Sequence, residues 1–174
     1  MQGFERVPDA IEPLIGYRAW FFVLDGRRAS LFPISRRDLE APSPWDGAHR
    51  DWVSASCHGV APYLAGFGPE LCVSCPRHDV PDEECSCGFY ATKTLAVFLG
   101  SSLFRRDCIL GRVELAGKVI ECTAGYRAER ARIVELIPLR GTEPAAIRLA
   151  RRLRLPLRAS LPFTPRPERG PSAA

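Results

Sequence analysis

The stretch CVSCPRHDVPDEECSCG, residues 72–88, concentrates five metal-ligating side chains in a short segment. The candidate ligands are Cys72, Cys75, His78, Cys85 and Cys87. A structural Zn²⁺ takes four cysteine or histidine ligands in tetrahedral geometry, commonly as two close-spaced pairs joined by a loop. Gly88 directly follows a cysteine and allows the backbone to turn around a metal-bound sulfur. This stretch therefore predicts a zinc site around which the chain is organised.

Five candidates compete for four positions, so two ligand sets remain open. The four cysteines give an all-thiolate site, and His78 in place of Cys72 or Cys75 gives a Cys₃His site. Either closed set indicates a structural ion, because catalytic zinc keeps one position open for water. The alternatives without metal are a reducible disulfide pair and thiols that lie close by accident. A disulfide framework is disfavoured because seven cysteines is an odd number and no secretory signal precedes them. We predict one structural Zn²⁺ per chain.

Length and composition describe an ordinary globular chain. Its 174 residues, 46% hydrophobic and 25% charged, predict a single zinc-stabilised domain over residues 1–160. A Pro-rich tail, residues 161–174, is expected to be disordered. The first residues contain no apolar signal core, and no window approaches eighteen uninterrupted apolar residues. We therefore expect no membrane association and a cytoplasmic location.

The basic residues are almost all arginine, and they gather at the C-terminal end. Lys93 and Lys118 are the only lysines, a bias typical of GC-rich coding sequence, so the arginine count alone is weak evidence for phosphate binding. From Arg140 onward the local net charge is +6, which leaves about −2 for the preceding residues of a chain with net charge +4. The C-terminal end is therefore the basic part of the protein.

Two stretches predict antiparallel hairpins. In residues 16–34 two aromatic and β-branched runs meet at Asp25-Gly26, which is typical of a type I′ turn because both central residues need positive φ. In residues 108–122 alternating runs meet at Ala116-Gly117, which predicts a second hairpin. Residues 126–138 follow as a third strand.

The intervening segments are less regular. Residues 35–70 read as a long loop, in which Trp45 and Trp52 are expected to pack the loop onto the first hairpin. Cys57-His58 also falls here and ranks below the local cluster as a source of metal ligands. Residues 89–99 fit a helix, although a buried strand fits almost as well. The fold class is therefore β-rich α+β, with antiparallel hairpins around a zinc-stapled loop and one or two peripheral helices.

Residues 142–154 give the clearest helix signal. Thr142 is a suitable N-cap, an acid lies in the first turn, and Pro156 ends the pattern. The apolar stripe is predicted to contain Ile147, Leu149, Ala150 and Leu153. The arginines on the other face are Arg148, Arg151, Arg152 and Arg154. This face is either a solvated surface or a source of contacts to phosphate or a protein partner.

The segment Gly-Tyr-Arg-Ala occurs twice, at residues 16–19 and 125–128. Each copy opens a predicted strand. Four residues are too few to prove a repeat, and coincidence is the simpler interpretation. The sharper interpretation is that each tyrosine packs a strand start while Arg18 and Arg127 face a shared polar groove, where they join the candidate binding residues.

These motifs together resemble a loose family of small actinobacterial proteins. The matching segments are His78-Asp79-Val80-Pro81, Cys85-Ser86-Cys87-Gly88-Phe89-Tyr90-Ala91, Gly111-Arg112-Val113 and the two Gly-Tyr-Arg-Ala copies. The resemblance spans roughly residues 16–156, and the Cys/His portion is its most specific part. It implies that His78, Cys85 and Cys87 are ligands together with one upstream cysteine, which favours the Cys₃His set. It implies no particular activity.

Three classes of function fit these residues. The first is a zinc-stabilised binding module that contacts nucleic acid through the arginine-rich helix and arginines beside aromatic residues. The second is a protein-interaction or regulatory adaptor that uses the same helix and the Pro-rich tail. The third, an enzyme, is disfavoured because no phosphate loop, serine elbow or His-Glu-x-x-His motif is present. We assign no catalytic residue.

Overall fold

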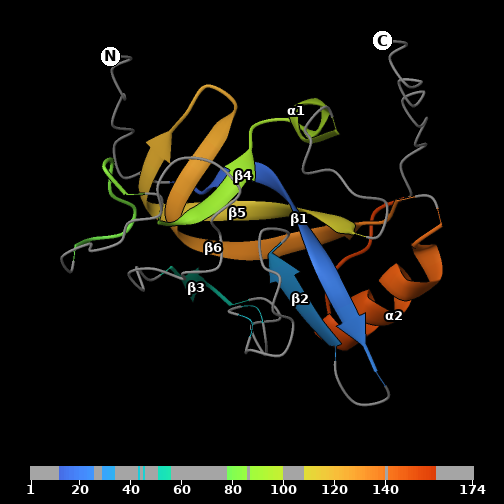
Figure 1. Cartoon of the computed structure of the whole chain (residues 1–174). Coiled ribbons are helices and arrows are strands. Elements are labelled where there is room, and N and C mark those ends of the chain that lie inside the picture. Colours follow the sequence, from blue (N-terminus) through green and yellow to red (C-terminus); the bar gives the residue numbers. More distant parts are fainter. Residues whose placement is uncertain are drawn as a thin grey trace, which may run out of the picture.

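The fold is given by a computed structural model that describes residues 12–25, 29–33, 43, 45, 51–55, 78–85, 87–99, 108–139 and 141–159. The elements in chain order are β1 (Leu14–Leu24), β2 (Ala29–Pro33), β3 (Val53–Ser54), β4 (Phe89–Thr92), α1 (Leu95–Leu99), β5 (Ile109–Glu121), β6 (Gly125–Ile137) and α2 (Glu143–Leu153). All pairs between these strands are antiparallel. The prediction of a β-rich α+β fold is confirmed (Figure 1).

The strand pairing closes on itself to form a small barrel. One edge of β1 pairs with β5, and the other edge pairs with β2 and, through Tyr17 and Thr92, with β4. One edge of β6 pairs with β5, and its other edge pairs with β4 and β3. The short strand β4 therefore bridges β1 and β6 and completes the circuit, as Figure 1 shows for the green strand between the blue and orange ones.

The first predicted hairpin is confirmed as a pair of strands, although Gly26 of its predicted turn lies outside the described residues, and the second is wrong. β1 and β2 pair from Trp20 with Pro33 to Leu24 with Ala29. β5, in contrast, runs without a break through Ala116-Gly117. Gly117 has φ of +75°, and the register to β6 shifts at this point, so the dipeptide forms a β-bulge rather than a turn. The second hairpin instead joins β5 to β6, with a turn closed by the hydrogen bond from Cys122 N to Gly125 O (2.8 Å). The third predicted strand corresponds to β6.

Residues 89–99 divide between the two structures that the sequence left open. Phe89 and Ala91 are buried and Tyr90 is exposed, the alternation of a strand. The chain then turns into the short helix α1, of which Phe98 is buried. Thr94 Oγ1 accepts a hydrogen bond from Val97 N (3.3 Å) at the start of that helix. Thr94 therefore acts as the N-cap of α1. Both interpretations of this stretch are therefore correct in part, because it contains a strand followed by one short helix.

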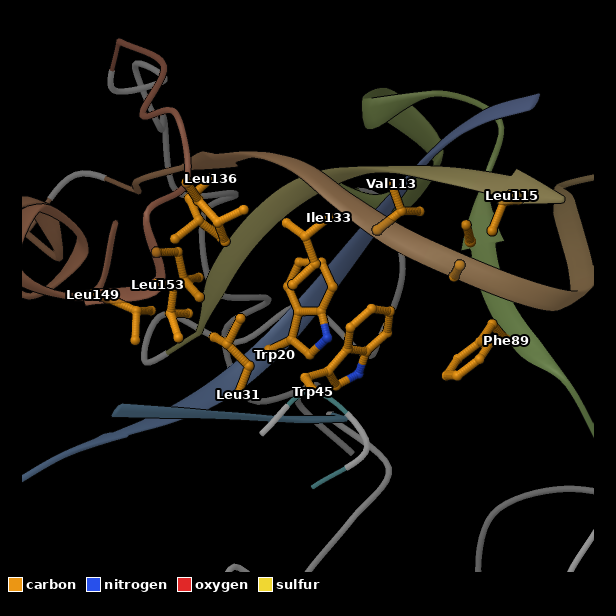
Figure 2. Close-up of a cluster of buried hydrophobic side chains, with 14 of the residues drawn as sticks. Trp20, Leu31, Trp45, Phe89, Val113, Leu115, Ile133, Leu136, Leu149 and Leu153 are labelled. Atoms are coloured by element: carbon orange, nitrogen blue, oxygen red, sulfur yellow. The ribbon is translucent and has the colours of Figure 1, made fainter. Parts of the chain in front are cut away.

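The main hydrophobic core fills the barrel from α2 at one end to Phe89 at the other. Figure 2 shows Leu149 and Leu153 of α2 directed toward Leu31 and Trp20, with Trp45 and Phe89 beyond them. The ring of Trp45 lies 5.6 Å from that of Trp20 and 5.2 Å from that of Phe89, measured between centroids. Trp45 therefore packs onto the first hairpin, as predicted. Trp52 instead lies beside β6, where its ring is 4.9 Å from Arg132 Cζ.

A second buried cluster lies on the outer face of the barrel. It joins Phe98 of α1 to Ala19 of β1 and Leu110 of β5, and Cys108 lies in the same cluster with no exposed surface. Cys108 is thus a small buried apolar side chain, which is the usual environment of a cysteine outside disulfides and metal sites. Neither helix in the described part of the chain has the length and apolar character needed to cross a membrane.

The helix α2 is confirmed, with two corrections to its details. Its buried residues are Ala146, Leu149, Ala150 and Leu153, whereas Ile147 is 41% exposed and lies outside the apolar stripe. Thr142 precedes the helix, but its hydroxyl donates to Leu139 O (2.8 Å) and makes no capping bond. The helix ends at Arg154, a residue with left-handed φ of 52°. The predicted tail, residues 161–174, lies outside the described residues.

Candidate metal centre

A tight turn places Cys85 just before the closing strand β4. Asp82 Oδ1 accepts a hydrogen bond from Glu84 N (2.9 Å), and Asp82 O accepts one from Cys85 N (3.2 Å). Aspartate commonly forms such turns, because its side chain can bond to the backbone two residues on. Gly88 then has φ of +113°, a conformation that other residues rarely adopt, and redirects the chain into β4. These local bonds bring Cys85 and Cys87 to one side of the loop.

His78, Cys85 and Cys87 form a group that could hold a metal ion. One ligand atom from each residue lies within 4.8 Å of the other two. Cys85 is buried, and the other two residues are partly buried. Tetrahedral zinc with Zn–S bonds of about 2.3 Å separates two sulfurs by about 3.8 Å, so a small movement of the side chains would complete the geometry. These are three of the five predicted ligands.

The orientation of His78 fits a metal ligand. Its Nδ1 lies 2.9 Å from the carbonyl oxygen of Asp79. Because a carbonyl oxygen only accepts, Nδ1 must donate the proton of this bond, and in the neutral imidazole Nε2 then carries the lone pair. His78 Nε2 is buried and has no hydrogen-bond partner among the described residues. Metal-binding histidines usually donate the other ring N–H to an oxygen in this manner, which fixes the tautomer that a metal needs.

The donor set suits zinc. Thiolate sulfur and imidazole nitrogen are the ligands of structural zinc sites, and hard cations such as Ca²⁺ and Mg²⁺ prefer oxygen. The described group supplies three ligands, so a closed site needs one more. The other predicted ligands, Cys72 and Cys75, lie outside the described residues, as does the lower-ranked pair Cys57-His58.

Arg127 holds the loop from β6. Its Nη1 donates a hydrogen bond to the carbonyl oxygen of Cys85, and its side chain is only 7% exposed. Its Cζ lies 6.0 Å from the centroid of the Tyr90 ring. Burial is the main cause that raises the pKa of Tyr90, and the positive charge of Arg127 acts in the opposite direction. Arg127 is therefore a structural neighbour of the metal group rather than part of an exposed groove.

Arg18 reaches the same segment from β1. Its Nη1 donates to Tyr90 O (2.5 Å), and its Cζ lies 5.9 Å from the Phe89 ring and 6.0 Å from the Trp45 ring. Burial lowers the pKa of Arg18 to about 10, so the guanidinium remains charged at neutral pH. Its Nε is enclosed, with no hydrogen-bond partner in the described part of the chain. The shared polar groove expected for the two arginines is thus replaced by two separate enclosed positions.

The helix arginines form a different surface, remote in sequence from the metal group. Arg148, Arg151, Arg152 and Arg154 are all exposed. Arg152 also donates to Asp25 O (3.2 Å) at the end of β1. Of the six arginines predicted to bind a partner, only these four have side chains exposed to solvent, as contact with a partner requires.

Sequence reasoning missed the contact between Arg127 and the cysteine loop. The only signal for it was the repetition of Gly-Tyr-Arg-Ala, which carries no information about the partner of either arginine. Comparisons with known proteins give no match: no protein-family model matches the chain, and neither does any curated protein or solved structure. The resemblance based on the Cys/His motif stays a prediction. The functional argument therefore rests on the burial, contacts and charges of this chain's own residues.

Proposed function

We propose that this protein is a small β-barrel binding module stapled by a structural zinc ion. The ion is held by His78, Cys85, Cys87 and one upstream cysteine, either Cys72 or Cys75. The observation that carries the proposal is the buried His78 Nε2, which has no hydrogen-bond partner within the described ranges and lies within 4.8 Å of two thiols. An imidazole nitrogen enclosed without a partner is costly unless it binds something, and a metal ion shared with the thiols meets that need.

The proposed zinc ion would have a structural role in the loop that precedes β4. The loop that bears the ligands has turns but, among its described residues, no regular strand before Phe89, and it leads directly into the strand that closes the barrel. Zinc sites of this kind contribute free energy to folding because the ion binds the folded loop and not the unfolded chain. The ion would fix the loop and so define where β4 begins.

Elemental analysis of protein purified without added metal tests the site. We expect one zinc per chain, lost in Cys87→Ser and in His78→Ala. Cys122→Ser is the matched control, because Cys122 is a partly buried cysteine outside the described metal group, and it should retain the zinc. Comparing Cys72→Ser with Cys75→Ser identifies the fourth ligand. Wild-type protein that is folded as purified, contains no zinc and binds none when Zn²⁺ is added would overturn the proposal.

The binding surface is the exposed arginine face of α2. Arginine pairs well with phosphate because its planar guanidinium donates two parallel hydrogen bonds. Arg148 and Arg151 are exposed on this face, and the nearest acid in the helix, Glu143, lies in the first turn. We therefore propose nucleic acid as the partner, held mainly through its phosphates.

Fluorescence anisotropy with labelled single- and double-stranded oligonucleotides tests this surface. Binding should weaken steeply with salt, and the double variant Arg148→Gln/Arg151→Gln should reduce the slope of log K against log salt by about 2, because each lost phosphate contact removes about one. Arg130→Gln on β6 is the control for a general loss of charge. No binding of either oligonucleotide at low salt would rule out this partner.

A hollow beside α2 favours a protein partner as the second candidate. Its volume is about 410 Å³, and its lining combines exposed Ile147 and Leu157 with Arg151 and Arg154. An apolar floor with a basic rim fits a peptide that carries an apolar anchor next to acidic residues. Ile147→Glu separates the two candidates, because it should abolish capture of such a peptide while nucleic-acid affinity changes less than in the double arginine variant.

A further inference from the structure

The segment that follows the metal ligands lies between the two Gly-Tyr-Arg-Ala copies. Thr92 of β4 pairs with Tyr17 of the first copy on one edge and with Gly125 of the second copy on the other. These contacts join parts of the chain that are far apart in sequence. The repeated tetrapeptide thus occupies both sides of the strand that closes the barrel.

The glycine of each copy leaves room for β4. A Cβ added at Gly16 would lie 2.6 Å from the Cβ of Ala91, and one added at Gly125 would overlap the carbonyl oxygen of Ala91. Any larger residue at either position would push β4 away. Both glycines therefore serve close approach to the same residue.

The arginine of each copy fixes one end of the segment from Cys85 to Tyr90. Arg127 donates to the carbonyl of Cys85, and Arg18 donates to the carbonyl of Tyr90. Arg127 lies over the ring of Tyr90, and Arg18 lies over the ring of Phe89. Because neighbouring strand residues point to opposite faces, the two guanidinium groups hold the segment from opposite faces. Cys87 is between the two fixed carbonyls.

The charge of Arg127 also suits a metal–thiolate centre. None of the ion pairs found among the described residues includes Arg127. A Zn²⁺ with three thiolates and one imidazole has a net charge of −1, since each thiolate contributes one negative charge. A hydrogen bond from a cation is stronger than one between neutral groups, so the bond to Cys85 O is well suited to fix the backbone next to a ligand.

We propose that Arg127 is a positioning residue for the metal site and that it couples metal binding to the pairing of β4 with β6. The inference rests on the proposed zinc site. With the metal bound, the cysteine loop is fixed and β4 is in register with the barrel. Without the metal, the loop loosens and β4 loses protection even though β5 and β6 remain paired. Arg127 carries this effect because it bonds the ligand-bearing loop from a barrel strand.

Cobalt binding to the full-length, metal-free chain tests the positioning role. Arg127→Met removes the donors and keeps much of the length, Arg127→Lys keeps the charge, and Arg130→Met is the control, because Arg130 is exposed on the same strand. We expect Arg127→Met to weaken Co²⁺ binding about 10- to 100-fold, the usual effect of losing a partner of a ligand, and Arg130→Met to have no effect. Arg127→Lys should recover part of the affinity. The visible spectrum at saturating Co²⁺ should stay that of tetrahedral thiolate coordination in every variant.

Hydrogen exchange of the β4 amides provides a readout that a general loss of stability would not change in the same way. In the wild type, metal removal should speed exchange at Tyr90 and Ala91 more than at the middle of β5. In Arg127→Met, exchange at β4 should be fast with or without metal. If Arg127→Met does not fold, Arg127→Lys decides the question by its affinity and by the metal dependence of its exchange.

Two failures are distinguishable. If the wild type binds neither Zn²⁺ nor Co²⁺, the proposed metal site itself is wrong. If the wild type binds metal but Arg127→Met binds it with equal affinity, or keeps metal-dependent exchange at β4, the positioning role alone is wrong.

Discussion

The two Gly-Tyr-Arg-Ala segments have the same four residues and flank the same strand, yet their side chains lie in different surroundings. Tyr17, the second residue of the first copy, pairs with Thr92, whereas Gly125, the first residue of the second copy, pairs with it. A shift of one residue in register moves every side chain to the opposite face. Arg18 therefore lies beside the buried ring of Phe89, and Arg127 beside the exposed Tyr90. Register, rather than local sequence, decides what each arginine contacts.

Gly125→Ala should lower the free energy of unfolding more than any other substitution in the two Gly-Tyr-Arg-Ala segments. The added methyl group would overlap the carbonyl oxygen of Ala91, and a backbone atom in a paired strand cannot move aside. We expect the free energy of unfolding to fall by about 3 kcal/mol, at the upper end of the range for an overpacked site. Urea denaturation measures it. A loss under about 0.5 kcal/mol would mean that β4 does not approach β6 this closely.

Gly16→Ala should cost less, and a second substitution should relieve it. Its methyl group would lie 2.6 Å from the methyl of Ala91, a side-chain atom. We expect a loss of about 1–2 kcal/mol. Ala91→Gly removes the opposing methyl, so it should recover part of that loss in the double variant. It should not recover the loss in Gly125→Ala, where the obstacle is the backbone. Equal rescue of both variants, measured as a double-mutant cycle, would contradict the assigned register.

Arg18→Met should have a smaller effect. The substitution removes the hydrogen bond to Tyr90 O, and it also removes a charge whose burial lowers the pKa of Arg18 to about 10. The two effects oppose each other, so we expect the free energy of unfolding to change by about 1 kcal/mol or less. Thermal and urea denaturation test this. A loss above about 3 kcal/mol would show that the guanidinium has an acidic partner.

The smallest effects should come from the two tyrosines. Tyr17 packs against the outer cluster and Tyr126 against the main core, and no hydrogen bond of either hydroxyl is found within the described residues. Tyr17→Phe and Tyr126→Phe should each change the free energy of unfolding by about 0.5 kcal/mol or less. A loss of about 1 kcal/mol or more in one of them would identify a hydroxyl that makes a buried bond.

The parts of the fold that sequence predicted are those with local signals. The turn dipeptide Asp25-Gly26 marked the first hairpin, and the 3.6-residue apolar pattern with Pro156 marked α2. Ala116-Gly117 led to an incorrect prediction of a turn. A bulge and a turn both need a residue that tolerates positive φ, and apolar and polar residues alternate in a similar way on both sides of each. Only the pairing partner, which lies on another strand, separates the two structures.

In the candidate site, too, the features that depend on residues close in sequence could be predicted, and those that depend on distant contacts could not. The candidate ligands His78, Cys85 and Cys87 could be predicted because metal ligands close in sequence have a recognisable spacing. The closure of the barrel could not be predicted, because β4 meets β1 through a single residue pair in which the side chain of Thr92 bonds to a residue 75 positions away. The burial of Arg127 was equally hidden. An arginine in an arginine-rich chain looks like a surface residue until its acceptor, a backbone carbonyl 42 positions away, is known.

The separation of Cys85 and Arg127 along the chain also has a consequence during synthesis on the ribosome. Cys85 leaves the exit tunnel 42 residues before Arg127 does. At about 5–20 residues per second, the interval is about 2–8 s. During those seconds the clustered thiols have neither β6 beside them nor an arginine bonded to their loop. If the proposed site binds zinc, each new copy of the protein would pass through a brief period in which zinc and oxidants compete for the thiols of Cys85 and Cys87.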